Sequence, residues 1–172
     1  MHCPGSKTLM LAGSKPMILM YNSNVLPQKH VKFGEWALKL TPCGQAGKWI
    51  HDFDKITALY KPGSVSYAVS DSFLKNITAN IEFIPMASAQ GILIKIRIAA
   101  RKPGEKIKIA WLWGGMKSTP DTYCPWEPGQ KDHVVPRAED CADNQIDVGE
   151  KLFWLYRKDI PGIAVCGACT WQ

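Results

Sequence analysis

The sequence predicts an all-β chain folded as an antiparallel β-sandwich, and three stretches carry most of this prediction. Residues 77–83, 92–98 and 107–113 each alternate apolar with polar or small residues. A period of two places successive side chains on opposite faces of a strand, so each stretch offers one apolar face to a common core. The short connections at residues 87–91 and 101–105 are typical of an antiparallel meander.

Four further strands are predicted before this region. Residues 16–21 form a short apolar strand, and residues 33–40 alternate as a second one. Residues 56–60 and 65–69 flank the sequence Lys61-Pro62-Gly63-Ser64. Proline presets φ and glycine tolerates positive φ, which suits the central positions of a type II turn. These two strands are therefore predicted to form a hairpin.

One long irregular loop is predicted after the alternating region, from residue 117 to residue 141, where periodicity is weak and prolines are frequent. Loops of this length inside a compact domain are usually functional or mobile. Residues 144–148, 152–156 and 163–171 then give three more strands. Because no helical period, internal repeat or linker is visible, residues 1–172 are predicted to form a single domain.

The scattered basic residues argue against a nucleic acid partner, and the short apolar runs argue against a membrane helix. The net charge of +6 comes from 21 basic and 15 acidic residues, and the basic residues are scattered rather than clustered. No apolar run reaches the roughly 20 residues that a membrane helix needs. The N-terminal sequence lacks the features of a signal peptide. The chain is thus either cytoplasmic or a segment of a longer exported protein.

Six cysteines occur without regular spacing, and the only closely spaced pair is Cys166-Gly-Ala-Cys169. A zinc site would need a second pair or a histidine pair, and a thioredoxin-like site would need a following helix, so no metal or cofactor is predicted. Buried free thiols are the favoured interpretation. A bridge between Cys124 and Cys141 stays open if the compartment is oxidising.

Aromatic and acidic residues near the long loop give the best functional signal. Trp113 ends a predicted strand, and Asp121, Tyr123 and Trp126 follow in the loop. Sugar rings present flat C–H faces that pack on aromatic rings, while carboxylates accept hydrogen bonds from hydroxyls. These four residues are candidates for a carbohydrate or interdomain contact. The alternative is that the tryptophans fill the core beneath the loop.

No catalytic residue is predicted. Glycoside hydrolysis needs two carboxyl groups held roughly 5 to 9.5 Å apart across a cleft. The acidic residues between Asp121 and Asp143 lie on an irregular loop, so a small enzyme using them is the least favoured hypothesis. The sequence also lacks a Gly-x-Ser-x-Gly nucleophile motif and a phosphate-binding glycine loop.

Several short motifs together suggest a family. They are Leu11-Ala12-Gly13 with Lys15-Pro16, Ile56 to Gly63 followed by Tyr67, Gln90-Gly91-Ile92, Trp111 to Gly115, and Cys141-Ala142-Asp143-Asn144 before Phe153. This order resembles the N-terminal β-sandwich, or supersandwich, domain of large bacterial proteins assigned as glycoside hydrolases. In that family the catalytic part is a downstream helical (α/α) toroid.

The resemblance implies a non-catalytic domain that packs on its own downstream catalytic domain. The parent protein would be a periplasmic or exported glycoside hydrolase, and Trp113, Gly114, Gly115 and the following loop would lie near the interface or the cleft. The many cysteines and the start of this chain depart from the family pattern. The alternative function is a stand-alone glycan-binding module that uses Trp113, Tyr123 and Trp126 to bind an oligosaccharide.

Overall fold

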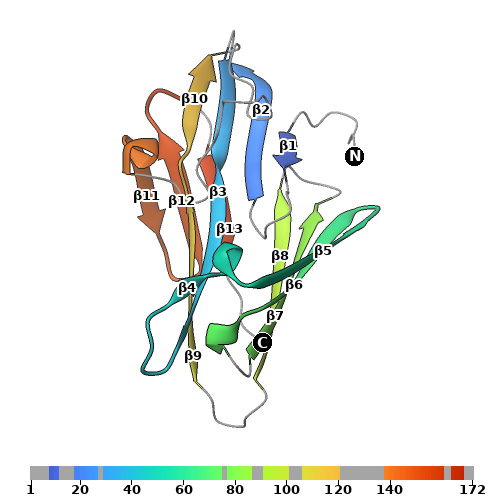
Figure 1. Ribbon diagram of the computed structural model, residues 1–172. Helices are drawn as coiled ribbons and strands as arrows, with labels where there is room; N and C mark the ends of the chain where they lie inside the picture. The colour runs from blue at the N-terminus through green and yellow to red at the C-terminus, as the bar shows by residue number, and fades with distance from the viewer. Residues whose placement is uncertain are drawn as a thin grey trace. The chain divides into compact units, whose positions relative to one another are not determined.

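The computed structural model describes residues 8–11, 18–26, 29–74, 77–86, 91–100, 106–120, 138–160 and 164–168. Within these ranges the regular structure is β-strand with three short 3₁₀ helices, and the strands whose register is defined pair antiparallel. The predicted all-β, sandwich-like fold is therefore confirmed (Figure 1). The strands are β1 (Thr8–Leu11), β2 (Ile18–Leu26), β3 (Lys29–Pro42), β4 (Lys48–Trp49), β5 (Lys55–Lys61), β6 (Ser64–Ser70), β7 (Ile77–Pro85), β8 (Ile92–Ala100), β9 (Ile107–Gly114), β10 (Lys117–Pro120), β11 (Asn144–Val148), β12 (Leu152–Arg157) and β13 (Ala164–Ala168). The 3₁₀ helices are η1 (Ile50–Asp52), η2 (Ser72–Leu74) and η3 (Ala138–Cys141).

The chain divides into two compact units. The first unit consists of Met1–Ser6, Leu11–Ile18 and Ala37–Leu112, and the second of Lys7–Met10, Leu19–Trp36 and Trp113–Gln172. Strand β3 begins in the second unit and ends in the first. Its two parts accordingly pair with different strands: the first part with β10, and the last part with β4.

The first unit contains a four-stranded sheet in the order β5-β6-β7-β8. Its inner face carries the predicted apolar set of β7, where Ile77, Ala79, Ile81 and Phe83 are all buried. Tyr67 on β6 lies edge-on to the Phe83 ring, with the ring centroids 5.7 Å apart. The isoleucines at alternate positions of β8 are half-buried and the residues between them are exposed, as predicted. The period of two thus identified both faces of this sheet.

The turn between β5 and β6 also agrees with the prediction. Lys61 pairs with Ser64 at the end of the ladder, which leaves Pro62 and Gly63 as the turn residues. Gly63 has a φ of +84°, the region that the third residue of a type II turn requires. The hairpin is therefore confirmed.

The meander prediction is correct for β7 and β8 but wrong for β9. Strands β7 and β8 pair antiparallel, whereas β9 pairs with β3 instead of continuing the sheet. The half-buried residues of β9 still alternate with exposed Lys108 and Ala110. A two-residue period shows that a strand has one buried face, but it does not select the neighbouring strand, so the pattern alone could not exclude this crossover.

In the first unit, a cluster of charged and polar side chains links the segment before β5 to the segment after β6. The Asp71 carboxylate, whose side chain is fully buried, lies 2.7 Å from the Lys48 ammonium and accepts a hydrogen bond of 3.0 Å from the Asp54 backbone N–H. The Asp54 carboxylate in turn accepts hydrogen bonds from the Ser72 backbone N–H and hydroxyl. The two aspartates therefore connect the residues before β5 with those after β6.

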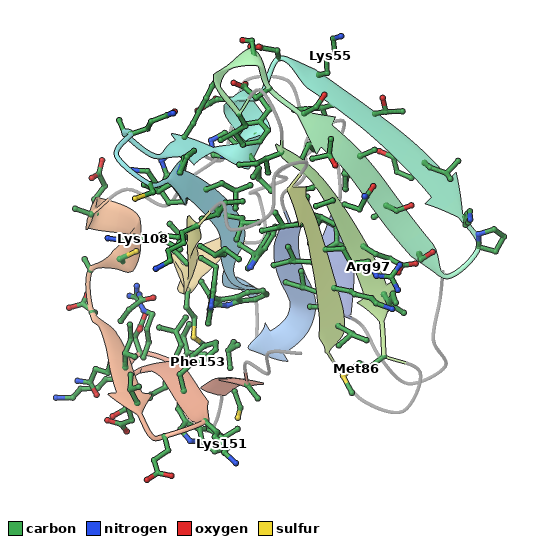
Figure 2. All side chains as sticks on the ribbon, turned by 90° about the horizontal axis from the view of Figure 1, so that it is seen from below. Lys55, Met86, Arg97, Lys108, Lys151 and Phe153 are labelled. Carbon is green, nitrogen blue, oxygen red and sulfur yellow. The ribbon has the colours of Figure 1, made fainter. Side chains whose placement is uncertain are left out.

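The second unit contains a three-stranded sheet in the order β11-β12-β13. Leu155 on β12 is buried, and Phe153 two residues earlier lies directly opposite Gly167 on β13. A Cβ atom on Gly167 would clash with the Phe153 ring. Because Gly167 has no side chain, the Phe153 ring can lie directly over the backbone of β13. Figure 2 labels Phe153 on this sheet and Lys151 in the turn between β11 and β12.

Part of the predicted long loop is ordered as secondary structure. Its first four residues form β10, paired with the start of β3, and residues 138–141 form η3. The prediction of a structureless segment from 117 to 141 is therefore wrong at both ends. Strand β10 is too short for its alternation to be recognised, and its Pro120 is a residue that usually argues against a strand.

Candidate functional site

Trp113 is the only one of the four predicted site residues that lies in the described part of the chain. It stands near the end of β9 and is half-buried, so it is neither a core tryptophan nor a fully exposed one. A Cβ atom on Gly34 would meet its indole Nε1 at 2.6 Å, so the ring lies close over the Gly34 backbone. Asp121, Tyr123 and Trp126 lie outside the described residues.

The chain after Trp113 makes a tight corner, held by two side chains from the β11–β12 region. Gly115 has a φ of +78° and Met116 is fully buried. The Met116 N–H donates to Asn144 Oδ1 at 3.0 Å, and Asn144 Nδ2 donates to the Met116 carbonyl at 2.9 Å. Arg157 Nη1 donates to the same carbonyl at 3.2 Å. The side-chain amide of Asn144 therefore makes the two hydrogen bonds that a neighbouring strand would otherwise make with the buried Met116 backbone.

We expect Asn144→Ala to destabilise the fold by about 2 kcal/mol, because both polar groups of the Met116 backbone lose a partner. Asn144→Asp should also destabilise, since a carboxylate cannot donate to the Met116 carbonyl. Asn80→Ala is the control, because Asn80 is exposed. The measurement is the urea midpoint at pH 7; equal midpoints for the Asn144 and Asn80 variants would contradict this role.

The outer face of the three-stranded sheet exposes aromatic and apolar side chains. Trp154 is 46% exposed and Leu152 is 45% exposed, and both lie on the same face of β12. Cys166, directly opposite Trp154 on β13, is exposed as well. Exposed large apolar side chains that share one face mark contact surfaces more often than isolated ones do.

Polar groups lie beside Trp154 on this face. Asp147 on β11 is directly opposite Trp154, and Gln145 is opposite Tyr156. The negative charge of Asp147, together with some burial and a hydrogen bond to that carboxylate, raises the pKa of Tyr156. The face thus combines an aromatic ring with a carboxylate and an amide, the residue types that contact sugars.

Apolar residues of β11 are exposed on the other face of the sheet. Ile146, opposite the buried Leu155, is 58% exposed, and Val148 is 77% exposed. Among the described strands, β11 is an end strand of this sheet, so these two exposed side chains lie at its edge.

Sequence reasoning missed this surface, although a signal for it was present. The stretch from Leu152 to Tyr156 is apolar at every position, so a single buried face cannot account for it. A strand that is apolar on both faces is either covered on both or exposes one of them.

The cysteines differ from the prediction of buried thiols. Cys43 and Cys166 are exposed and Cys141 is half-buried, and all three are free. The buried-thiol interpretation is therefore wrong for Cys43 and Cys166, which lie in a turn and on an end strand. In the described part of the chain, no group of three or more His, Cys, Asp or Glu residues is placed to hold a metal ion. The described residues also include no helix long and apolar enough to cross a membrane.

Comparison with known proteins gives one family. A family model described as "Domain of unknown function (DUF4450)" matches residues 34–162. The chain belongs to the DUF4450 family. The DUF4450 match includes Gly34, the corner at Trp113 to Met116, Asn144 and the exposed strand β12. No curated protein and no solved structure matches the chain significantly.

Proposed function

We propose that this DUF4450 chain is the non-catalytic β-sandwich domain of a bacterial carbohydrate-active enzyme, a glycoside hydrolase that is periplasmic or exported. Its partner would be the enzyme's own downstream catalytic domain, docked on the sheet of β11, β12 and β13. The observation that supports this proposal is the concentration of exposed large apolar side chains on one small sheet: Ile146, Val148, Leu152 and Trp154.

The free energy that burial of these exposed side chains would contribute favours a docked partner over chance exposure. Full burial of an aliphatic or aromatic side chain of this size contributes about 1.5 to 3 kcal/mol. Ile146 and Val148 share one face of the sheet, so a single partner can cover both. Covering them would contribute a few kcal/mol, which helps to stabilise an interface inside one polypeptide, where the second domain is tethered at high effective concentration. The family resemblance suggests a catalytic domain as the partner, and the exposed apolar side chains suggest that this domain docks on the sheet.

Hydrogen exchange on two proteins tests this proposal: the chain alone and the chain continued into the catalytic domain of its reading frame. We expect amides of β11 and β12 to be protected in the longer protein, while those of β5 in the first unit exchange at equal rates in both. The pair Ile146→Asp and Val148→Asp should remove the added protection, and Lys151→Asp in the adjacent turn should not. A reading frame without a catalytic domain, or unchanged exchange in β11 and β12, would overturn it.

A glycan-binding module is the second candidate function, because Trp154 lies beside Asp147 and Tyr156 on an exposed face. In this alternative the isolated chain binds oligosaccharides directly.

Trp154→Ala should then weaken binding of a neutral oligosaccharide at least tenfold, because stacking on the indole is lost. Met86→Ala is the matched control, since Met86 is, like Trp154, 46% exposed and belongs to the first unit. Titration calorimetry of the isolated chain measures both variants. Binding that is unaffected by Trp154→Ala but lost in Trp126→Ala would move the site to the loop.

A further inference from the structure

We propose that the outer face of the β5–β8 sheet binds an acidic carbohydrate, one whose sugar units carry carboxylate or sulfate groups. This surface lies on a different sheet from the docking surface proposed above, and either proposal can fail without the other. It rests on the side chains that the strand register brings together on β6, β7 and β8.

A shallow depression of about 220 Å³ lies on this face. The side chains of Ser66, Asn80, Glu82, Lys95 and Arg97 line it. The depression therefore holds two cations, one carboxylate, one amide and one hydroxyl. Figure 2 shows Arg97 directed away from the side chains in the interior of the first unit.

The strand register fixes this arrangement. Arg97 lies directly opposite Asn80, and Lys95 lies opposite Glu82, which in turn lies opposite Ser66. Lys95 and Arg97 are two residues apart on one strand, so their Cα atoms are separated by about 6.6 Å. All five side chains consequently stand on one face, supported by the buried residues of β7 behind them.

The charge of the whole outer face is positive. Lys55 and Lys61, on the outer positions of β5, are exposed and belong to the same face as Lys95 and Arg97. Glu82 is the single acidic residue among the outer positions of β5 to β8. Four cations against one carboxylate attract an anionic ligand, and Arg97 can bind a carboxylate or sulfate group through two parallel hydrogen bonds.

The remaining side chains favour a sugar over a nucleic acid. Six outer positions carry small hydroxyl or amide groups, which exchange hydrogen bonds with sugar hydroxyls: Thr57, Ser64, Ser66, Ser70, Thr78 and Asn80. The exposed Leu59 and Leu93 share this face and can contact the apolar C–H surfaces of a sugar ring. No aromatic residue occupies an outer position of these four strands, so bases would find no ring to stack on. Glu82 inside the depression can accept hydrogen bonds from sugar hydroxyls.

The test is calorimetric titration of the chain with four probes of similar length: an oligogalacturonate, a sulfated galactan oligosaccharide, a neutral galacto-oligosaccharide and oligo-dT. We expect one or both acidic sugars to bind, more weakly at high salt. The carboxylate and sulfate probes decide which acid the site prefers. Binding of the neutral sugar with equal affinity, tighter binding of oligo-dT, or no binding of either acidic sugar would overturn the proposal.

Variants locate the site. Arg97→Ala should weaken binding of the acidic sugar at least tenfold, and Arg97→Lys should weaken it less, because one cation remains but the paired hydrogen bonds are lost. Lys108→Ala on β9 removes the same charge from an exposed position elsewhere and should leave affinity within twofold. Equal losses for Arg97→Ala and Lys108→Ala would indicate general charge attraction and overturn the site. Because Arg97 and Lys108 are both exposed, we expect the variants to fold like the wild type, and melting curves check this.

Discussion

Gly34→Ala should destabilise the protein by about 3 to 5 kcal/mol, because the added methyl group would cause both backbone strain and a steric clash. Gly34 has a φ of +125°, a conformation that residues with a Cβ atom rarely adopt. The added carbon would also lie 2.6 Å from Trp113 Nε1 and 3.0 Å from the Gly114 carbonyl oxygen. Backbone strain and overpacking each contribute about 1 to 3 kcal/mol. In a chain of this length the melting temperature should fall by about 10 °C.

Gly44→Ala separates the two contributions. Gly44 has a φ of +76°, and no heavy atom lies within 4 Å of the position that a Cβ would take, so this variant carries backbone strain alone and should lose only about 1 kcal/mol. Combining Gly34→Ala with Trp113→Ala should cost less than the sum of the single changes, because the clash with the indole is removed. Equal melting temperatures for the Gly34 and Gly44 variants would contradict the close approach of Trp113.

Asp71→Ala should be the second most destabilising change, at about 2 to 4 kcal/mol. The carboxylate is buried, and its loss leaves the Asp54 N–H and the Lys48 ammonium without their shared acceptor. The Asp71 hydrogen bond is also the main reason that the pKa of Lys48 lies above its usual value. Chemical unfolding at pH 7 measures the loss.

Asp71→Asn tests how much of this loss comes from charge. The amide keeps the shape and can still accept from the Asp54 N–H through its oxygen, so this variant should be intermediate between the wild type and Asp71→Ala. Asp52→Ala is the control, because Asp52 is exposed. If Asp71→Ala were as stable as Asp52→Ala, the cluster would have no structural role.

The sequence was sufficient for properties that depend on a short period and insufficient for those that depend on distant partners. Ile77, Ala79, Ile81 and Phe83 were predicted to share a core face, because alternation alone determines which side a strand buries. The pairing of β9 with β3 could not be predicted, since the alternation of β9 suits any neighbour. The close approach of Trp113 to Gly34 joins residues far apart in the sequence and left no local signal.

The candidate surfaces show the same division. Aromatic residues near the long loop drew attention by their composition, whereas Trp154 was assigned to an ordinary strand and its exposure became evident only from the register of β12. Arg97 and Lys95 were recognised as the polar side of an alternating strand. That Asn80 and Glu82 stand opposite them depends on how β7 and β8 are aligned, which periodicity does not specify.

The end-strand position of β11 has a consequence for the behaviour of the chain in solution. Among the described residues, β11 pairs with β12 alone, so it is an end strand, and it carries the exposed Ile146 and Val148. Exposed apolar end strands are templates for pairing between molecules, and natural proteins usually protect them with charges, prolines or a covering segment. Separated from a covering partner, the chain would thus be drawn toward concentration-dependent self-association, and its solubility would report whether β11 is covered.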